Sequence, residues 1–184
     1  MIKFEEQGKS VGVIFDLSIR HTDDGRRIID VVKKSFSSIF REFSENNVDN
    51  VYLYQHDDLT FKTLHGEISA MIGNYKSDGE SFDVSDALKQ TLFLLHNTGD
   101  HFERKYLFLV TDRISSIKPL IKIVSLNRNF GLDAKIVIFG IGEKYIRSEL
   151  ESFASTDPEV KLIHVNQPQL LTLQFFKESI NDGE

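Results

Sequence analysis

The stretch Val11-Gly12-Val13-Ile14-Phe15-Asp16-Leu17-Ser18 decides the fold that we expect for this chain. Its apolar run is typical of a strand buried on both faces of a sheet, and the run ends on an aspartate. A second run, Leu107-Phe108-Leu109-Val110-Thr111-Asp112, ends in the same way. Ligands of parallel α/β sheets bind outside the carboxyl ends of the strands. We therefore expect Asp16 and Asp112 to offer oxygen atoms around one point.

Strand-like and helix-like segments alternate along the rest of the chain. Apolar residues at helical spacing predict helices over residues 25–45, 67–75, 83–96, 117–129, 145–155 and 170–180. Apolar runs predict strands over 134–139 and 160–165, and a hairpin of 51–55 and 59–64 with a polar turn at 56–58. Because parallel strands need crossover helices, this order predicts an α/β fold: a mostly parallel sheet with one antiparallel edge strand and helices on both faces.

The composition restricts the class of protein. The 184 residues are expected to form a single domain, residues 1–184, with its core at about 10–180. The absence of cysteine excludes disulfides, thiolate metal sites and a cysteine nucleophile. A net charge of −6 favours neither nucleic acid nor an anionic membrane as partner. No apolar run is long enough to span a bilayer and the first ten residues are not apolar, so a cytoplasmic location is expected.

Several segments together carry a family resemblance. Phe15-Asp16-Leu17-Ser18-Ile19-Arg20, the long helix, the hairpin, Val110-Thr111-Asp112-Arg113 and Phe139-Gly140-Ile141-Gly142 resemble a von Willebrand factor type A domain in order and spacing. The resemblance covers roughly residues 10–180. It implies a three-layer, Rossmann-like fold with a six-stranded sheet. It also implies a binding module rather than an enzyme, since domains of this family mainly bind other molecules.

The resemblance also implies a candidate metal site. Many domains of this family hold an ion at a metal-ion-dependent adhesion site that begins Asp-x-Ser-x-Ser and is completed by a later threonine and aspartate. The matching residues here are Asp16, Ser18 and Asp112. Their hydroxyl and carboxylate oxygens suit a hard ion, so Mg²⁺ and Mn²⁺ are the candidate cofactors.

Two positions depart from that pattern. Arg20 stands in place of the second serine, and Phe82 stands where the threonine is expected, although a slip of one residue would bring Ser81 there. A guanidinium competes with a divalent cation and can pair with a carboxylate. At ~4 Å and an effective dielectric near 20, such an interaction is on the order of 4 kcal/mol, enough to offset weak metal binding. The site therefore has the sequence of a degenerate adhesion site.

The leading hypothesis is a protein-binding or scaffold module, either alone or as one part of a larger assembly. Its recognition surface would comprise the three candidate metal ligands together with Arg20, Ser81, Phe82 and Arg113. One alternative is metal-dependent adhesion; another is that Asp16 and Ser18 only cap a helix or hold a turn. A haloacid-dehalogenase-like phosphatase would need a second aspartate as acid/base at position 18, which is serine. The histidines show no zinc-site spacing and the remaining phenylalanines are expected in the core.

Overall fold

The computed structural model describes ten stretches of the chain, and the fold is derived from them. They are residues 9–17, 25–45, 48–55, 58–62, 84–97, 104–112, 116–131, 134–142, 147–158 and 160–180. The predicted helix over 67–75 and the proposed helix caps Asp23 and Asp24 lie outside these stretches. Among the described residues, no helix is both long enough and apolar enough to cross a membrane.

The described strands form one six-stranded sheet in the order β3-β2-β1-β4-β5-β6. They are β1 (Lys9–Asp16), β2 (Val48–Gln55), β3 (Asp58–Lys62), β4 (Arg104–Thr111), β5 (Lys135–Ile141) and β6 (Val160–Val165). Neighbouring strands run parallel, except that β2 and β3 pair antiparallel at one edge of the sheet. The predicted α/β class with an antiparallel edge strand is confirmed. The turn expected at 56–58 is shorter, since Asp58 already pairs with Gln55.

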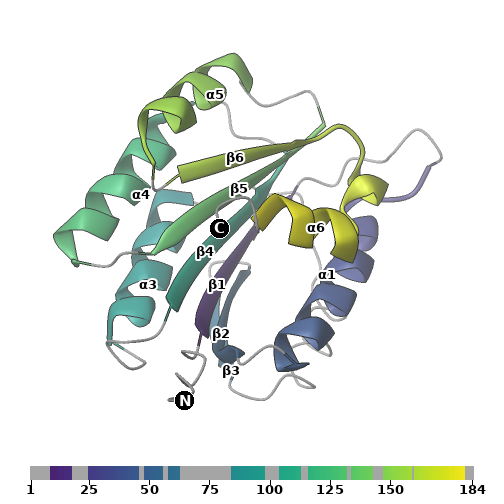
Figure 1. Ribbon diagram of the computed structural model, residues 1–184, viewed down its shortest axis with the longest axis horizontal. Helices are drawn as coiled ribbons and strands as arrows, with labels where there is room; N and C mark the ends of the chain where they lie inside the picture. The colour runs from purple at the N-terminus through teal and green to yellow at the C-terminus, as the bar shows by residue number, and fades with distance from the viewer. Residues whose placement is uncertain are drawn as a thin grey trace, which may run out of the picture.

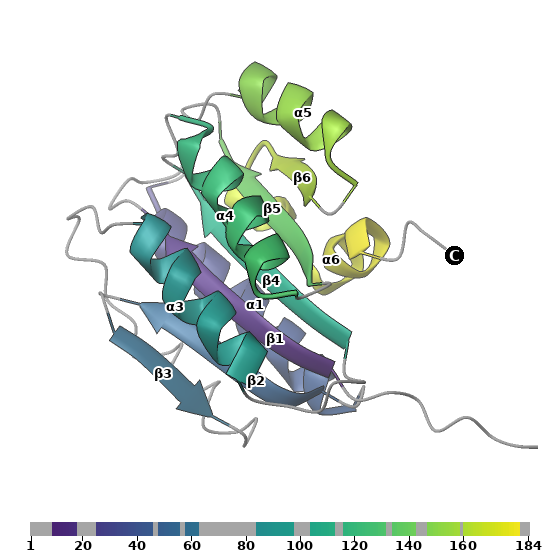
Figure 2. The ribbon, with the colours of Figure 1, turned by 90° about the vertical axis from the view of Figure 1, so that its left-hand side faces the viewer.

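Helices cover both faces of the sheet and make three layers (Figures 1 and 2). They are α1 (Ile28–Glu45), α3 (Val84–Asn97), α4 (Lys118–Asn129), α5 (Arg147–Thr156) and α6 (Leu173–Ile180), with a short 3₁₀ helix η1 (Pro168–Leu170). Figure 1 shows α1 and α6 on one face and α3, α4 and α5 on the other. The parallel strands β1, β4, β5 and β6 are therefore covered by helices on both faces, which buries their apolar side chains.

Alternate residues of the central strand face different cores. Val11, Val13 and Phe15 of β1 point toward α1 and α6, where they join a cluster that we call the aromatic core. Its buried phenylalanines among the described residues are Phe15, Phe36, Phe108, Phe139 and Phe176. Ile14 points to the opposite side and joins what we call the aliphatic core, under α3, α4 and α5. Apart from Tyr52, the buried members of the aliphatic core are Ile, Leu, Val and Ala.

Two predicted helices begin later than their apolar patterns suggest. The first begins at Ile28 rather than at residue 25, because Gly25 has a φ of +81°, which is not helical. The last was expected over 170–180, but η1 ends at Leu170 and α6 begins at Leu173. Between them, Thr172 caps α6: its Oγ1 accepts a hydrogen bond from the Phe175 N–H at 3.2 Å. Both differences thus have a local cause at the start of the helix.

The expectation that the phenylalanines lie in the core is wrong for Phe93. Its side chain is 54% exposed on α3, and its ring packs edge-on against Phe130, with the ring centroids 6.3 Å apart. His96 stacks on the same Phe130 ring, with the ring centroids 5.4 Å apart. The reason is helical period: the buried residues of α3 are Ala87, Leu88, Thr91, Leu92 and Leu95, and position 93 falls off that stripe.

Candidate functional site

The candidate site lies where β1 and β4 end, in the middle of the sheet. The two strands pair in parallel, and Asp16 is the register partner of Thr111. The Thr111 Oγ1 donates a hydrogen bond of 2.9 Å to the Asp16 Oδ2. Both side chains are buried, with 3% of Asp16 and none of Thr111 exposed. The hydroxyl therefore holds one oxygen of a carboxylate that has little access to water.

Asp112 follows Thr111 directly, so it also lies at the carboxyl ends of the two central strands. It is fully buried, and its backbone N–H donates to the Asp16 carbonyl at 3.4 Å, which extends the β1–β4 ladder past the end of β4. The structure thus brings Asp16 and Asp112, residues from distant parts of the sequence, to one edge. We call Asp16, Thr111 and Asp112 the strand-end site.

Sequence reasoning did not assign a role to Thr111. Its position gave a partial signal, since a threonine directly before the second aspartate lies at the end of its strand, where a parallel pairing can bring it beside the first aspartate. The hydrogen bond itself depends on the register of β1 against β4, which a single sequence does not specify. The other candidates, Ser18, Arg20, Ser81, Phe82 and Arg113, lie outside the described residues.

The strand-end site supplies part of a metal-binding shell. The carboxylates of Asp16 and Asp112 are ligands that Mg²⁺ and Mn²⁺ prefer. Mg²⁺ requires a near-octahedral set of oxygen ligands, and the described residues place two carboxylates and a hydroxyl already donated to one of them. Across the described stretches, no group of three or more His, Asp or Glu residues could hold a metal ion. The described donors therefore do not complete a metal site by themselves.

Gly140 and Gly142, at the carboxyl end of β5, show no phosphate-binding turn within the part of the chain that the structure describes. Gly140 and Ile141 belong to β5, and Gly142 follows with a φ of +78°. The Gly142 N–H donates to the Val165 carbonyl of β6 at 2.8 Å, so this amide points into the sheet. A phosphate cradle needs several amides directed at the ligand. Gly142 is better described as the residue that lets the chain leave β5.

Sequence comparisons leave the family unassigned: no family model matches the chain, and no curated protein matches it. Solved structures do match. The VWA domain of SpRpn10 superposes with a TM-score of 0.67 at 16% identity, covering 95% of this chain and 96% of that one. An aerotolerance-related membrane protein from Bacteroides fragilis gives 0.65 at 9% identity, covering 95% and 99%.

A third match is the von Willebrand factor type A protein from Catenulispora acidiphila, with a TM-score of 0.60 at 13% identity and 94% of this chain covered. This chain spans 42% of that one, and 47% and 61% of two further solved chains that it matches, about half of their length. The order of the elements and the sheet topology agree with the resemblance in the sequence. The chain therefore has the fold of a von Willebrand factor type A domain.

Proposed function

We propose that this chain is a non-enzymatic protein-binding module that recognises its partner at the carboxyl ends of the strands, with weak or no dependence on a metal ion. The strand-end site carries this proposal. Asp16 and Asp112 are buried at the middle of that edge, and Thr111 fixes one of the two carboxylates. Burial of two carboxylates at one end of the sheet is costly when they are ionised, so a cationic group beside them is stabilising.

The sequence next to the site offers such a group without a metal. Arg113 directly follows Asp112, and Arg20 lies in the segment that follows Asp16. A guanidinium can pair bidentately with a carboxylate, either one of its own chain or one of a partner. In this proposal a carboxylate of the partner binds an arginine, where a complete adhesion site would bind it through the metal ion.

The direct test is site-specific photo-crosslinking in the cells from which the protein comes. A photoreactive amino acid at position 113 is expected to trap a partner, and the same amino acid at the exposed Lys135 is the control. Lys135 begins β5, so it lies at the amino ends of the parallel strands, and it alternates with Ile136, which faces α4 and α5. Crosslinks that form equally from both positions would contradict recognition at the strand-end site.

Metal dependence is tested on the same crosslink. EDTA is expected to leave its yield unchanged, whereas Arg20→Ala is expected to lower it several-fold. In parallel, titration calorimetry of the metal-free protein with Mg²⁺ and Mn²⁺ compares the wild type with Asp112→Ala. Saturable binding that the variant loses, together with an EDTA-sensitive crosslink, would support the alternative of metal-dependent adhesion, which the two buried carboxylates favour.

The phosphatase alternative lacks support at two points. Position 18 is a serine, which cannot serve as the acid/base, and the Asp16 carboxylate that would attack phosphorus is buried and accepts a hydrogen bond from Thr111. We therefore expect no turnover of a generic phosphate ester such as p-nitrophenyl phosphate. Turnover that Asp16→Asn abolishes would revive the enzyme hypothesis.

A further inference from the structure

A second feature of the surface, away from the strand-end site, is a groove between α4 and α5. Its volume is about 460 Å³, and its lining residues are Ile117, Ser148, Glu149, Ser152, Phe153 and Thr156. Ile117 precedes α4, and the other five belong to one side of α5. The volume falls in the range of sites that take a small ligand or a few side chains of a peptide. We call it the α4–α5 groove.

The apolar part of the groove continues onto exposed surface. Ile117 and Phe153 are partly buried where they line it. Ile121 lies one helical turn after Ile117, on the same side of α4, and its side chain is 48% exposed. Ile121 thus extends the apolar surface of Ile117 along α4, where a partner's apolar side chain can cover it.

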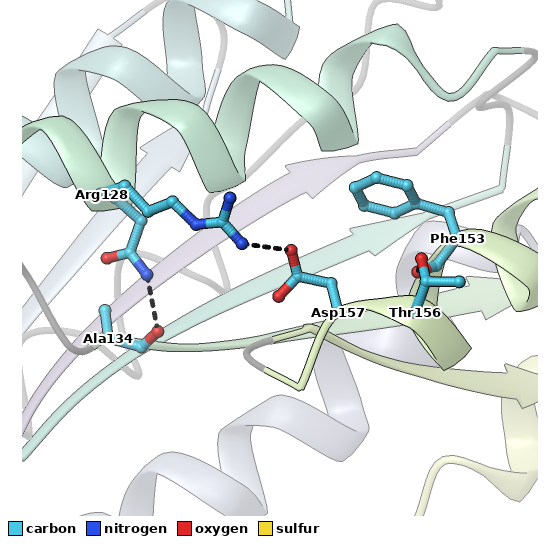
Figure 3. Close-up of polar contacts among 6 residues, drawn as sticks. Arg128, Ala134, Phe153, Thr156 and Asp157 are labelled. Atoms are coloured by element: carbon cyan, nitrogen blue, oxygen red, sulfur yellow. Dashed lines mark hydrogen bonds and ion pairs between the residues drawn. The ribbon is translucent and has the colours of Figure 1, made fainter.

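An ion pair links α4 and α5 next to Thr156, the last residue of α5 that lines the groove. The Arg128 Nη2 donates to the Asp157 Oδ2 at 3.1 Å, which links the end of α4 to the residue after α5. Figure 3 shows Phe153 and Thr156 on α5 beside this pair, with the Phe153 ring directed toward the α4 side. The pair therefore fixes the distance between the two helices at one end of α5.

The charges next to the groove are positive on its α4 side. Residues 118–129 contain Lys118, Lys122 and Arg128 and no acidic residue, although the whole chain has a net charge of −6. All three cationic side chains are exposed. Within the described residues, no ion pair joins Lys118 or Lys122 to a carboxylate. On the α5 side, Glu149 lines the groove and Glu151 pairs with Arg147.

We propose that the α4–α5 groove binds an acidic peptide segment of a partner protein, one large aliphatic or aromatic side chain of which packs against Ile117, Ile121 and Phe153. Charge complementarity selects this occupant: the partner's carboxylates lie along Lys118 and Lys122, away from Glu149. The apolar side chain supplies most of the affinity, because large buried side chains dominate such interfaces. This proposal is independent of the strand-end site.

The test begins with selection from a library of random peptides about a dozen residues long, displayed on phage and presented to the immobilised wild-type protein. Peptides that also bind the Lys118→Glu/Lys122→Glu variant are removed. The enriched peptides are expected to combine Asp or Glu with Leu, Ile, Phe or Trp. No enrichment, or enrichment of peptides without acidic residues, would overturn the proposal.

The most enriched peptide is then synthesised with a fluorescent label, and its Kd is measured by anisotropy. We expect Lys118→Glu/Lys122→Glu and Ile121→Asp each to raise the Kd at least about tenfold. The matched control is Lys89→Glu, the same charge reversal at an exposed position of α3, with an expected change below about twofold. Asp112→Asn is expected to leave this Kd unchanged, which separates the groove from the strand-end site. Circular dichroism verifies that each variant is folded.

Three results would reject an acidic peptide as the occupant. An effect of Lys89→Glu as large as that of the groove variants would show that only overall charge matters. Self-association of the wild type that Ile121→Asp abolishes, seen by analytical ultracentrifugation, would assign the groove to a second copy of the chain. Binding of a labelled single-stranded oligonucleotide that the lysine variant loses would assign the basic face to nucleic acid.

Discussion

The two faces of the sheet bury chemically different cores. In the aromatic core, Phe36 of α1 and Phe176 of α6 meet over the sheet, with their ring centroids 6.2 Å apart. In the aliphatic core, Leu, Ile, Val and Ala fill the space under three helices, with Tyr52 as the one buried aromatic member among the described residues. Among the described residues, two of the three exposed large apolar side chains, Phe93 and Ile121, lie on the helices of the aliphatic face.

We infer from this difference that the layer of α1 and α6 mainly stabilises the fold, whereas the layer of α3, α4 and α5 can also bind a partner. Interlocked rings under α1 and α6 form many directional contacts, which makes that layer costly to rearrange. The helices on the other face pack through smaller side chains, and the α4–α5 groove opens between two of them. We therefore expect substitutions in the aromatic core to have the largest effects on stability.

The first prediction concerns Phe36, which is fully buried and contacts Phe15 edge-on, with their ring centroids 5.1 Å apart. Phe36→Ala is expected to lower the free energy of unfolding by about 3–5 kcal/mol, because it leaves a cavity among the remaining rings. Urea denaturation measures the loss. Phe36→Leu, which fills most of the cavity, is the control and should cost clearly less. A loss below about 1 kcal/mol for Phe36→Ala would mean that the aromatic core readily collapses into the cavity.

The second prediction concerns the close approach of α3 to the central strand in the aliphatic core. A Cβ added to Gly12 would overlap the Thr91 Cγ2 and lie 3.3 Å from the Leu107 Cδ1. Gly12→Ala is therefore expected to lower the free energy of unfolding by about 1–3 kcal/mol, although alanine suits a strand better than glycine.

A double-mutant cycle tests the cause of that loss. Thr91→Ser removes the methyl group and keeps the hydroxyl, whose hydrogen bond to the Ala87 carbonyl measures 2.8 Å. In the Thr91→Ser background, Gly12→Ala should cost much less, and the difference in unfolding free energy gives the coupling. An equal cost in both backgrounds would show that the overlap with Thr91 is not the cause.

The third prediction concerns the hydrogen bond between Thr111 and Asp16 in the strand-end site. Thr111→Val keeps the shape of the side chain but removes the donor to the Asp16 Oδ2. Loss of this hydrogen bond to a buried carboxylate should lower the free energy of unfolding by about 1–3 kcal/mol. Thr111→Ser retains the hydroxyl and is the control, so it should recover a measurable part of the loss in urea denaturation. If both variants lose the same amount, the threonine methyl group and not the hydrogen bond accounts for the effect.

Much of this arrangement could be predicted from the sequence, because it depends on local patterns. Apolar runs and helical stripes gave the order of strands and helices, and the carboxyl-end rule placed Asp16 and Asp112 at one edge. The exposure of Phe93 was also visible, since this residue lies off the stripe that includes Leu88, Leu92 and Leu95. The large number of phenylalanines had instead suggested that all of them lie in the core.

Other features depend on tertiary geometry that no local pattern encodes. The Thr111–Asp16 hydrogen bond requires the observed register of β1 against β4. The α4–α5 groove depends on how far apart two helices pack, which side-chain volumes over the whole layer decide. The late start of α6 had a signal in Thr172, but a longer apolar stripe obscured it.

The last and smallest effect is expected at Arg128, where the aliphatic face ends in the ion pair with Asp157. The Arg128 side chain is 64% exposed, so water solvates most of its guanidinium and salt screens the pair. Arg128→Gln should therefore cost less than about 1 kcal/mol in urea denaturation, and the cost should fall further at high salt. Arg147→Gln, at an exposed pair within α5, is the matched control. A loss in unfolding free energy several-fold larger than that of the control would show that the Arg128–Asp157 pair stabilises the packing of α4 against α5. The groove beside the pair would then lie in a region that is needed for the stability of the fold.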